Sequence, residues 1–213
     1  IGADYTFSDG RKQKAGTIGT IGCTSFFPSK NLGCMGDGGA LFTNDDTLAK
    51  KIRMIANHGQ SVQYVHDEIG VNSRLDSIQA AILRVKLKHL DSYAAARQKA
   101  AAYYDKAFNG NSKITTPERS KNSTHVFHQY TLVLNGVNRD ELRQYLAEKE
   151  IPAMIYYPIP LHMQKAYKDE RYKEGQFPVT EKLCANVLSL PMHTELDEEQ
   201  LEYITRAVLE FCK

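Results

Sequence analysis

Several features that restrict what a protein can do are scarce or missing in this sequence. It has only four cysteines, Cys23, Cys34, Cys184 and Cys212. They are widely spaced and form no C-x-x-C pair, so neither a zinc site nor a disulfide framework is expected. No apolar run approaches the roughly 20 residues of a membrane span. We therefore expect a cytoplasmic enzyme with reduced thiols, no metal ion and no membrane contact.

The chain also lacks an excess of charge of one sign. Its 27 lysines and arginines face 25 aspartates and glutamates, which leaves a formal net charge of +2. No global electrostatic field therefore favours nucleic acid or an anionic membrane surface as a partner. A local basic pocket is compatible with this balance.

The beginning of the sequence, Ile1–Asp4, has no initiator methionine, no charged leader region and no apolar leader core. A tag or a signal peptide has a different composition. We expect the chain to be the later part of a longer polypeptide, or a processed chain.

A length of 213 residues is enough for one large domain or two small ones. Apolar spacing, capping residues and glycine turns predict an α/β protein. The expected strands are 17–27, 39–43, 127–134 and 151–156, and the expected helices follow Asn44–Asp46, span 75–90 and 94–108, follow Asn138, surround Thr180–Val187 and follow Asp197. The polar stretch that follows residue 109, and the new pattern of strands and helices after it, predict two domains, 1–108 and 109–213.

The predicted helix 75–90 is apolar on more than one side. Leu75, Ile78, Ile82 and Val85 form one stripe, and Leu83, Leu87 and Leu90 form a second. A helix of this kind is buried in a core or between subunits, and the sequence leaves both options open.

A single lysine, Lys30, lies between an apolar strand end and a turn of small and polar residues, with the hydroxyl of Ser25 five positions earlier. A lysine attacks an aldehyde only when it is partly neutral and held in place. Pyridoxal phosphate also needs phosphate ligands, which a hydroxyl and backbone N–H groups supply. Ser25 and Lys30 therefore form a candidate site for this cofactor.

The lysine pattern alone is weak, because most lysines near glycines are solvated surface residues. The glycine-rich turn Gly36–Gly39 is also a candidate for a nucleotide phosphate loop. It lacks the spacings G-x-x-x-x-G-K-[ST] and G-x-G-x-x-G, however, which argues against that reading.

Six short segments add to the lysine pattern. They are Ser25–Lys30, Gly36–Ala40, Asn57–Gly59, Gly70–Asp76 with Gln79–Ala81, Tyr157–His162 and Leu188–His193. In this order, through essentially the whole chain, they resemble the DegT/StrS family of nucleotide-sugar aminotransferases. Within the family the chain is most similar to enzymes that aminate UDP-2-acetamido-2-deoxy-3-oxo-glucuronate with glutamate as donor.

The resemblance implies a pyridoxal-phosphate transferase of fold type I, similar to aspartate aminotransferase. The chain would supply the end of the large domain, with long connecting helices, and the small C-terminal α/β domain. It also implies a homodimer with shared active sites, acting in bacterial surface polysaccharide biosynthesis.

The same resemblance implies roles for individual residues. Lys30 would form the internal aldimine and move the proton between cofactor and sugar. Ser25 would bind the cofactor phosphate, and Asn72 would reach it from the neighbouring subunit. Arg74 would pair with a uronate carboxylate, which suits a planar guanidinium. On residue type alone, Asn72 is a turn residue and Arg74 a surface arginine.

The sugar side of the pocket would be lined by Tyr156, Tyr157 and His162. Some relatives carry histidine at the position of Tyr156, so the sugar is left open. The family's ring-stacking aromatic residue and the aspartate that pairs with the pyridine nitrogen would precede Ile1, so this chain alone is expected to be inactive.

Two other functions are compatible with the sequence. Some relatives are sugar dehydratases, but they carry histidine in place of the lysine, so Lys30 argues against this activity. The other alternative is a non-catalytic binding or regulatory module that uses the helix 75–90.

Overall fold

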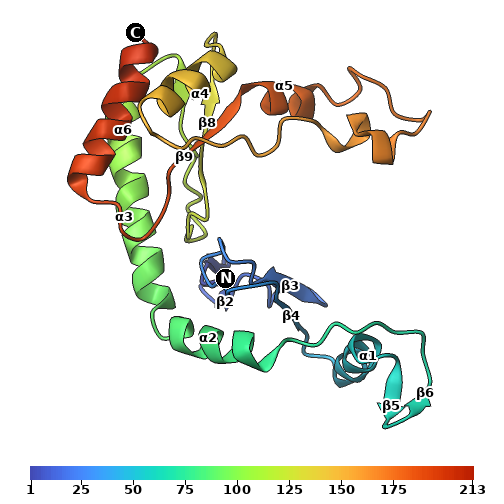
Figure 1. Ribbon diagram of the computed structural model, residues 1–213. Helices are drawn as coiled ribbons and strands as arrows, with labels where there is room; N and C mark the ends of the chain where they lie inside the picture. Colours follow the sequence, from blue (N-terminus) through green and yellow to red (C-terminus); the bar gives the residue numbers. More distant parts are fainter. The chain divides into compact units, whose positions relative to one another are not determined.

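The computed structural model describes residues 1–213 and has two compact α/β units. The first comprises residues 1–95 and 120–126, and the second comprises residues 96–119 and 127–213. Figure 1 shows the order of the elements along the chain. The predicted boundary between residues 108 and 109 stays a prediction.

The first unit is built from antiparallel hairpins and helices. The hairpins are β1 (Asp4–Thr6) with β2 (Lys12–Lys14), β3 (Gly22–Ser25) with β4 (Gly39–Phe42), and β5 (Gln60–Val62) with β6 (Val65–His66). The helices are α1 (Asp46–Ala56), α2 (Ser77–Leu87) and the first residues of α3 (Leu90–Phe108). The expected strands at 17–27 and 39–43 are therefore present in shorter form.

Local capping explains where α1 begins. The side chain of Asp45 accepts hydrogen bonds from the backbone N–H groups of Thr47 and Leu48. These N–H groups have no partner within the helix, so an aspartate here stabilises its first turn. The helix predicted after Asn44–Asp46 is confirmed.

The core of the first unit is a small apolar cluster beside the predicted lysine segment. Its buried members are Phe26, Leu32, Cys34, Leu83 and Leu90. Phe26 and Leu32 flank Lys30 in the sequence, so the apolar residues on both sides of the lysine anchor its turn.

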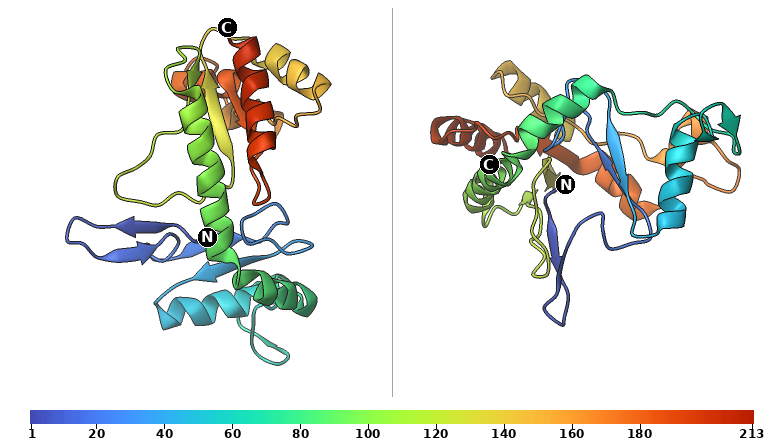
Figure 2. Two further views of the ribbon diagram at one scale, coloured as in Figure 1. Left: turned by 90° about the vertical axis from the view of Figure 1, so that its left-hand side faces the viewer. Right: turned by 90° about the horizontal axis from the view of Figure 1, so that it is seen from below.

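The second unit has one antiparallel sheet of order β7 (Ile114–Thr115), β8 (Tyr130–Leu134) and β9 (Val187–Leu190). Its helices are the rest of α3, α4 (Arg139–Glu148), α5 (Pro178–Asn186) and α6 (Glu198–Phe211), with short 3₁₀ turns at Leu161–Met163 and Lys165–Tyr167. In both views of Figure 2, α6 runs beside the C-terminal part of α3. The alternate residues Tyr130, Leu132 and Leu134 of the central strand β8 are buried in the core of this unit.

The core of the second unit is larger. The fully buried side chains include Tyr104, Phe108, Leu132, Leu142 and Leu188. They come from α3, β8, α4 and β9, so one cluster joins the sheet to its helices. Burying side chains of this size stabilises a fold by about 1.5–3 kcal/mol each.

One predicted strand needs correction, and the exposure of helix α2 bears on an alternative that the sequence left open. The strand predicted at 151–156 is not formed, because Met154 makes only an isolated bridge with Ser189. In helix α2, Ile78 and Val85 are 70% and 61% exposed, so their stripe does not enter this chain's core. Only Leu83 of α2 is buried.

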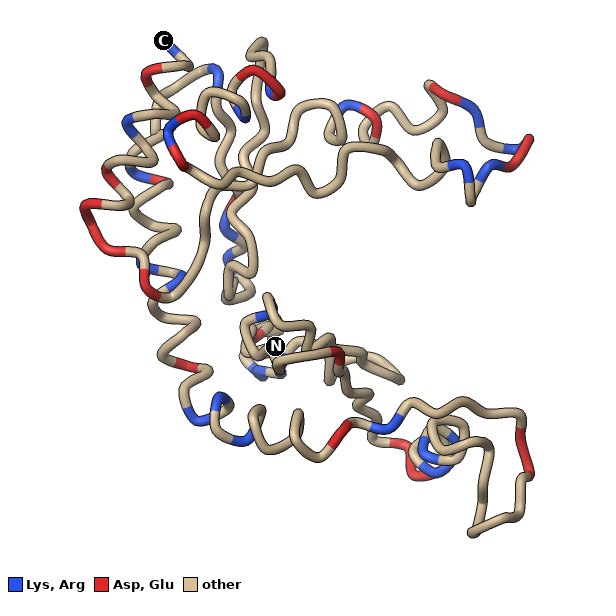
Figure 3. Tube along the Cα trace, viewed as in Figure 1, with Lys and Arg blue, Asp and Glu red and all other residues tan.

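No helix of the protein has both the length and the apolar character that a membrane crossing needs. Figure 3 shows lysine and arginine interspersed with aspartate and glutamate within each unit. The small net charge of +2 therefore does not hide a large segment of one sign.

Candidate active site

Ser25 and Lys30 lie on the two sides of the turn that follows β3. Ser25 is the last residue of β3, and its hydroxyl oxygen accepts a hydrogen bond from the N–H of Phe27 at 3.1 Å. Lys30 is half-buried, and its N–H donates to the carbonyl of Phe27 at 2.8 Å. The lysine therefore projects from a hydrogen-bonded turn rather than from a free loop.

Contacts with distant residues hold this turn. The Nδ2 of Asn31 donates to the carbonyl of Val126 at 2.7 Å, and the Nζ of Lys86 donates to the carbonyl of Gly33 at 2.6 Å. The thiol of Cys34 donates to the carbonyl of Phe26 at 2.9 Å. The backbone on each side of Lys30 is thus tied to other parts of the first unit.

The glycine-rich turn lies against the same segment. Ser25 and Gly39 are directly opposite in the β3–β4 pair. A Cβ atom added to Gly38 would lie 2.8 Å from the sulfur of Cys34 and 3.0 Å from Cδ1 of Leu75. Both distances are shorter than ordinary contacts, so a side chain at position 38 would force Cys34 or Leu75 to move.

Asn72 and Arg74 are brought together in the loop before α2. The Nε of Arg74 donates to Oδ1 of Asn72 at 3.1 Å, and the backbone of Asn72 forms a bridge with Asn57. Arg74 lines a pocket of about 500 Å³ together with Gly38 and Gly39. Arg74 and the glycine-rich turn therefore line one pocket of the first unit.

The three other predicted site residues belong to the second unit. Tyr156 is half-buried and Tyr157 is exposed, and their rings meet edge to face with centroids 5.6 Å apart. His162 is half-buried: its Nε2 lies 3.0 Å from Oε1 of Glu181, and its ring centroid lies 4.8 Å from that of Phe177.

The carboxylate of Glu181 is the centre of this second group. It accepts hydrogen bonds from the N–H groups of Gly175 and Phe177 as well as the contact with His162. Burial is the largest single influence on the pKa of Glu181 and raises it, but these hydrogen bonds together outweigh burial and hold the pKa below its usual value. The carboxylate thereby closes the loop that contains His162.

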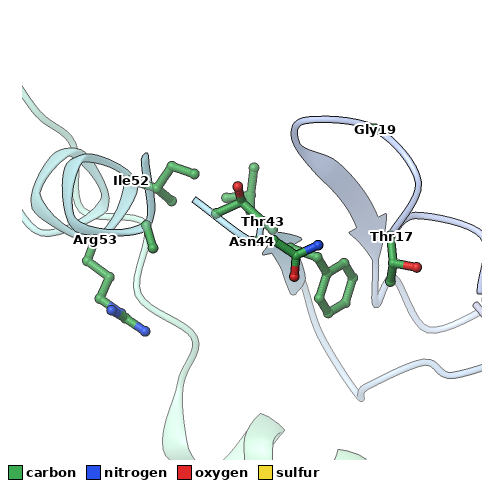
Figure 4. Close-up of a pocket in the computed structure, with 9 residues that line it drawn as sticks. Thr17, Gly19, Thr43, Asn44, Ile52 and Arg53 are labelled. Atoms are coloured by element: carbon green, nitrogen blue, oxygen red, sulfur yellow. The ribbon is translucent and has the colours of Figure 1, made fainter. Parts of the chain in front are cut away.

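Another pocket of the first unit contains none of the predicted site residues. Figure 4 shows Ile52 and Arg53 of α1 on one side, Thr43 and Asn44 in the middle, and Thr17 on the other side of this pocket. Its volume is about 370 Å³. It lies beside β4 rather than at the turn that carries Lys30.

Sequence reasoning missed Asn31 and Glu181 as contributors to these sites. The position of Asn31 directly after the lysine was a usable signal. Glu181 is 19 residues from His162, and no local spacing links the two.

Known proteins are similar to this chain in both sequence and fold. The model of the DegT/DnrJ/EryC1/StrS aminotransferase family matches residues 1–209. A pleiotropic regulatory protein of Geobacillus stearothermophilus is 48% identical over 100% of this chain and 56% of its own length. The UDP-2-acetamido-2-deoxy-3-oxo-D-glucuronate aminotransferase of Pseudomonas aeruginosa is 45% identical over 98% of this chain and 55% of its own length.

A solved structure gives the same result. The crystal structure of DesV from S. venezuelae in complex with a ketimine intermediate superposes with a TM-score of 0.91 at 39% identity, over 100% of this chain and 55% of that chain. The chain thus spans about half the length of the relatives it matches. The predicted type I transferase fold is confirmed, and the chain belongs to the DegT/DnrJ/EryC1/StrS aminotransferase family.

Proposed function

We propose that the protein containing this chain is a pyridoxal-phosphate-dependent aminotransferase that moves an amino group from glutamate to a keto-sugar nucleotide. The observation that carries the proposal is the match to this aminotransferase family over residues 1–209, with Lys30 on a braced turn. Enzymes of this family depend on pyridoxal phosphate.

The residues around Lys30 fit that cofactor chemically. An amine suits its aldehyde, and the hydroxyl of Ser25 together with a turn of glycines suits its phosphate. The close approach at Gly38 leaves room for backbone but not for a Cβ atom. When bound, the cofactor supplies an electron sink for the carbon that loses its proton.

In this proposal the side chains of the turn have distinct tasks. The Nζ of Lys30 holds the cofactor covalently at rest, and it accepts and returns the proton during transfer. The hydroxyl of Ser25 donates to the phosphate. Asn72 completes the phosphate ligands of the neighbouring subunit in a homodimer.

The finer proposal concerns the sugar. Arg74 is exposed and lines a pocket, and a guanidinium binds a carboxylate in a bidentate manner. We propose UDP-2-acetamido-2-deoxy-3-oxo-glucuronate as the substrate, because its uronate carboxylate fits this group and a 45% identical relative bears the name of that activity.

Tyr156, Tyr157 and His162 line the sugar side in this proposal. The ring of His162 is held by Glu181 and Phe177, so it offers the sugar a fixed surface. A cytoplasmic location and a role in surface polysaccharide synthesis belong to the same proposal.

The test uses the full-length protein that contains these residues, supplied with pyridoxal phosphate, glutamate and keto-sugar nucleotides. We expect an amino-sugar product from the wild type and a loss of at least about 100-fold in kcat for Lys30→Ala. Lys50→Ala, on an exposed position of α1, is the matched control and should keep full activity. A deoxygenated product without an amine would identify a dehydratase instead.

The sugar is tested with Arg74→Gln. Loss of a bidentate charged contact should lower kcat/KM for the uronate substrate by about 10–100-fold. For a 3-keto sugar without the carboxylate, the same variant should change kcat/KM little. Equal losses for both sugars would contradict the role of Arg74 in binding a uronate.

A further inference from the structure

Asn31, the residue that follows Lys30, is a buried amide with only half of its hydrogen-bonding capacity used. Its exposed fraction is 7%. Its Nδ2 donates to the carbonyl of Val126 at 2.7 Å, whereas its Oδ1 is buried without a partner. A buried acceptor without a partner costs free energy that an aliphatic side chain of similar size would avoid. The amide is therefore poorly explained as a core residue.

The one hydrogen bond of Asn31 joins two segments that are 95 residues apart. The acceptor segment, residues 120–126, is itself fixed by the β1 region: the N–H of Thr6 donates to the carbonyl of Asn122 at 2.6 Å, and the N–H of Thr124 donates to the carbonyl of Asp4 at 2.9 Å. Val126 is thus a firm attachment point. The backbone of the lysine turn is attached to it directly after Lys30.

Two other side chains brace this part of the chain further from the lysine. Lys86 reaches Gly33 and Gln79 reaches Met35, three and five residues after Lys30. Asn31 is adjacent, so a shift of its backbone moves the Cα atom of Lys30 directly. A displacement of about 1 Å at a reacting group lowers rates by about 100-fold.

We propose that Asn31 is a positioning residue, whose Nδ2 bond to the Val126 carbonyl sets the location of the Lys30 amine for its reaction with the cofactor aldehyde. This inference rests on the proposed function. The step forms a C=N bond between Nζ and the aldehyde carbon and releases one water.

The test measures how fast the full-length apoprotein links pyridoxal phosphate to Lys30 after mixing, followed by absorbance. Asn31→Asp keeps the shape of the side chain but replaces the donor with a carboxylate oxygen. Asn31→Leu keeps the branched shape with the same number of heavy atoms, and it also removes the unpartnered oxygen. We expect both variants to link the cofactor at least about 10-fold more slowly than the wild type.

Leu83→Ala is the matched control, because Leu83 belongs to the buried cluster that also contains Leu32, next to Asn31, but makes no hydrogen bond to the turn. We expect it to lower stability and to leave the linkage rate unchanged. A wild-type rate in both Asn31 variants, or an equal slowing in Leu83→Ala, would overturn the role of Asn31. A wild type that links no cofactor to Lys30 would reject the proposed function itself.

Discussion

The Nη1 atom of Arg97 lies 2.9 Å from the carbonyl oxygen of Met192. The same atom also reaches the carbonyls of Phe127 at 3.0 Å and His128 at 3.3 Å, so one guanidinium joins three backbone groups of the second unit. Burial lowers the pKa of Arg97, but an arginine stays charged at physiological pH. Met192 belongs to one of the segments that resemble the family, which makes Arg97 its structural support.

Replacing Arg97 should therefore destabilise the second unit. We expect Arg97→Met to lower the free energy of unfolding by about 2 kcal/mol or more, because it leaves buried carbonyls without their donor. Arg97→Lys should recover only part of the loss, because the lysine side chain is shorter and its ammonium does not reach the position of Nη1. Urea denaturation measures the free energy of unfolding of both variants. Arg84→Met, at an exposed position of α2, is the control. An unchanged midpoint for Arg97→Met would refute this role.

The loop closed by Glu181 should open in acid. The hydrogen bonds from Gly175, Phe177 and His162 hold the pKa of Glu181 below its usual value. A lowered folded-state pKa gives stability that is present above the unfolded pKa and is lost as the pH falls through the folded pKa. We expect the amide protection of Gly175 and Phe177 to fall below about pH 4, measured by hydrogen exchange corrected for the intrinsic rate.

Glu181→Gln separates this effect from general acid unfolding. The glutamine keeps the shape but has no charge to titrate. Its loop should therefore be less protected at neutral pH, and its protection should change little as the pH falls below about 4. If wild type and variant lose protection over the same pH range, Glu181 is not the titrating group.

The contact of Gly38 with the lysine segment predicts that this turn tolerates no side chain. An alanine Cβ would lie 2.8 Å from the sulfur of Cys34 and 3.0 Å from Cδ1 of Leu75. We expect Gly38→Ala to cost about 1–3 kcal/mol of stability through overpacking. Gly19→Ala is the matched control, because nothing lies within 4 Å of its Cβ position. Equal thermal midpoints for the two variants would contradict the close approach.

Elements with local signals were predictable from the sequence. Helix α6 begins after Asp197, whose side chain and that of Gln200 form a reciprocal capping box, and this pattern can be read from four residues. The predicted cap at Asn138 is also present: its side chain accepts hydrogen bonds from the N–H groups of Asp140 and Glu141 and donates one to the side chain of Glu141 at 2.8 Å. The sequence could place Ser25 and Lys30 close to each other, because only five positions separate them and both flank one turn.

Features that depend on distant residues were not predictable. The strand expected at 151–156 lacks a ladder because Met154 pairs with Ser189 at one point only. The apolar stripe of α2 indicated a helix, but periodicity does not tell what covers Ile78. The bond between Asn31 and Val126, and the pairing of His162 with Glu181, depend on how the chain folds back on itself.

The central claim is that Lys30 is the residue that carries the cofactor. The most direct measurement is borohydride reduction of the full-length protein loaded with pyridoxal phosphate, followed by peptide mapping. We predict that the mass of the reduced cofactor appears on the peptide containing Lys30 and disappears in Lys30→Ala. An unmodified Lys30 with the cofactor attached to another lysine would contradict the account.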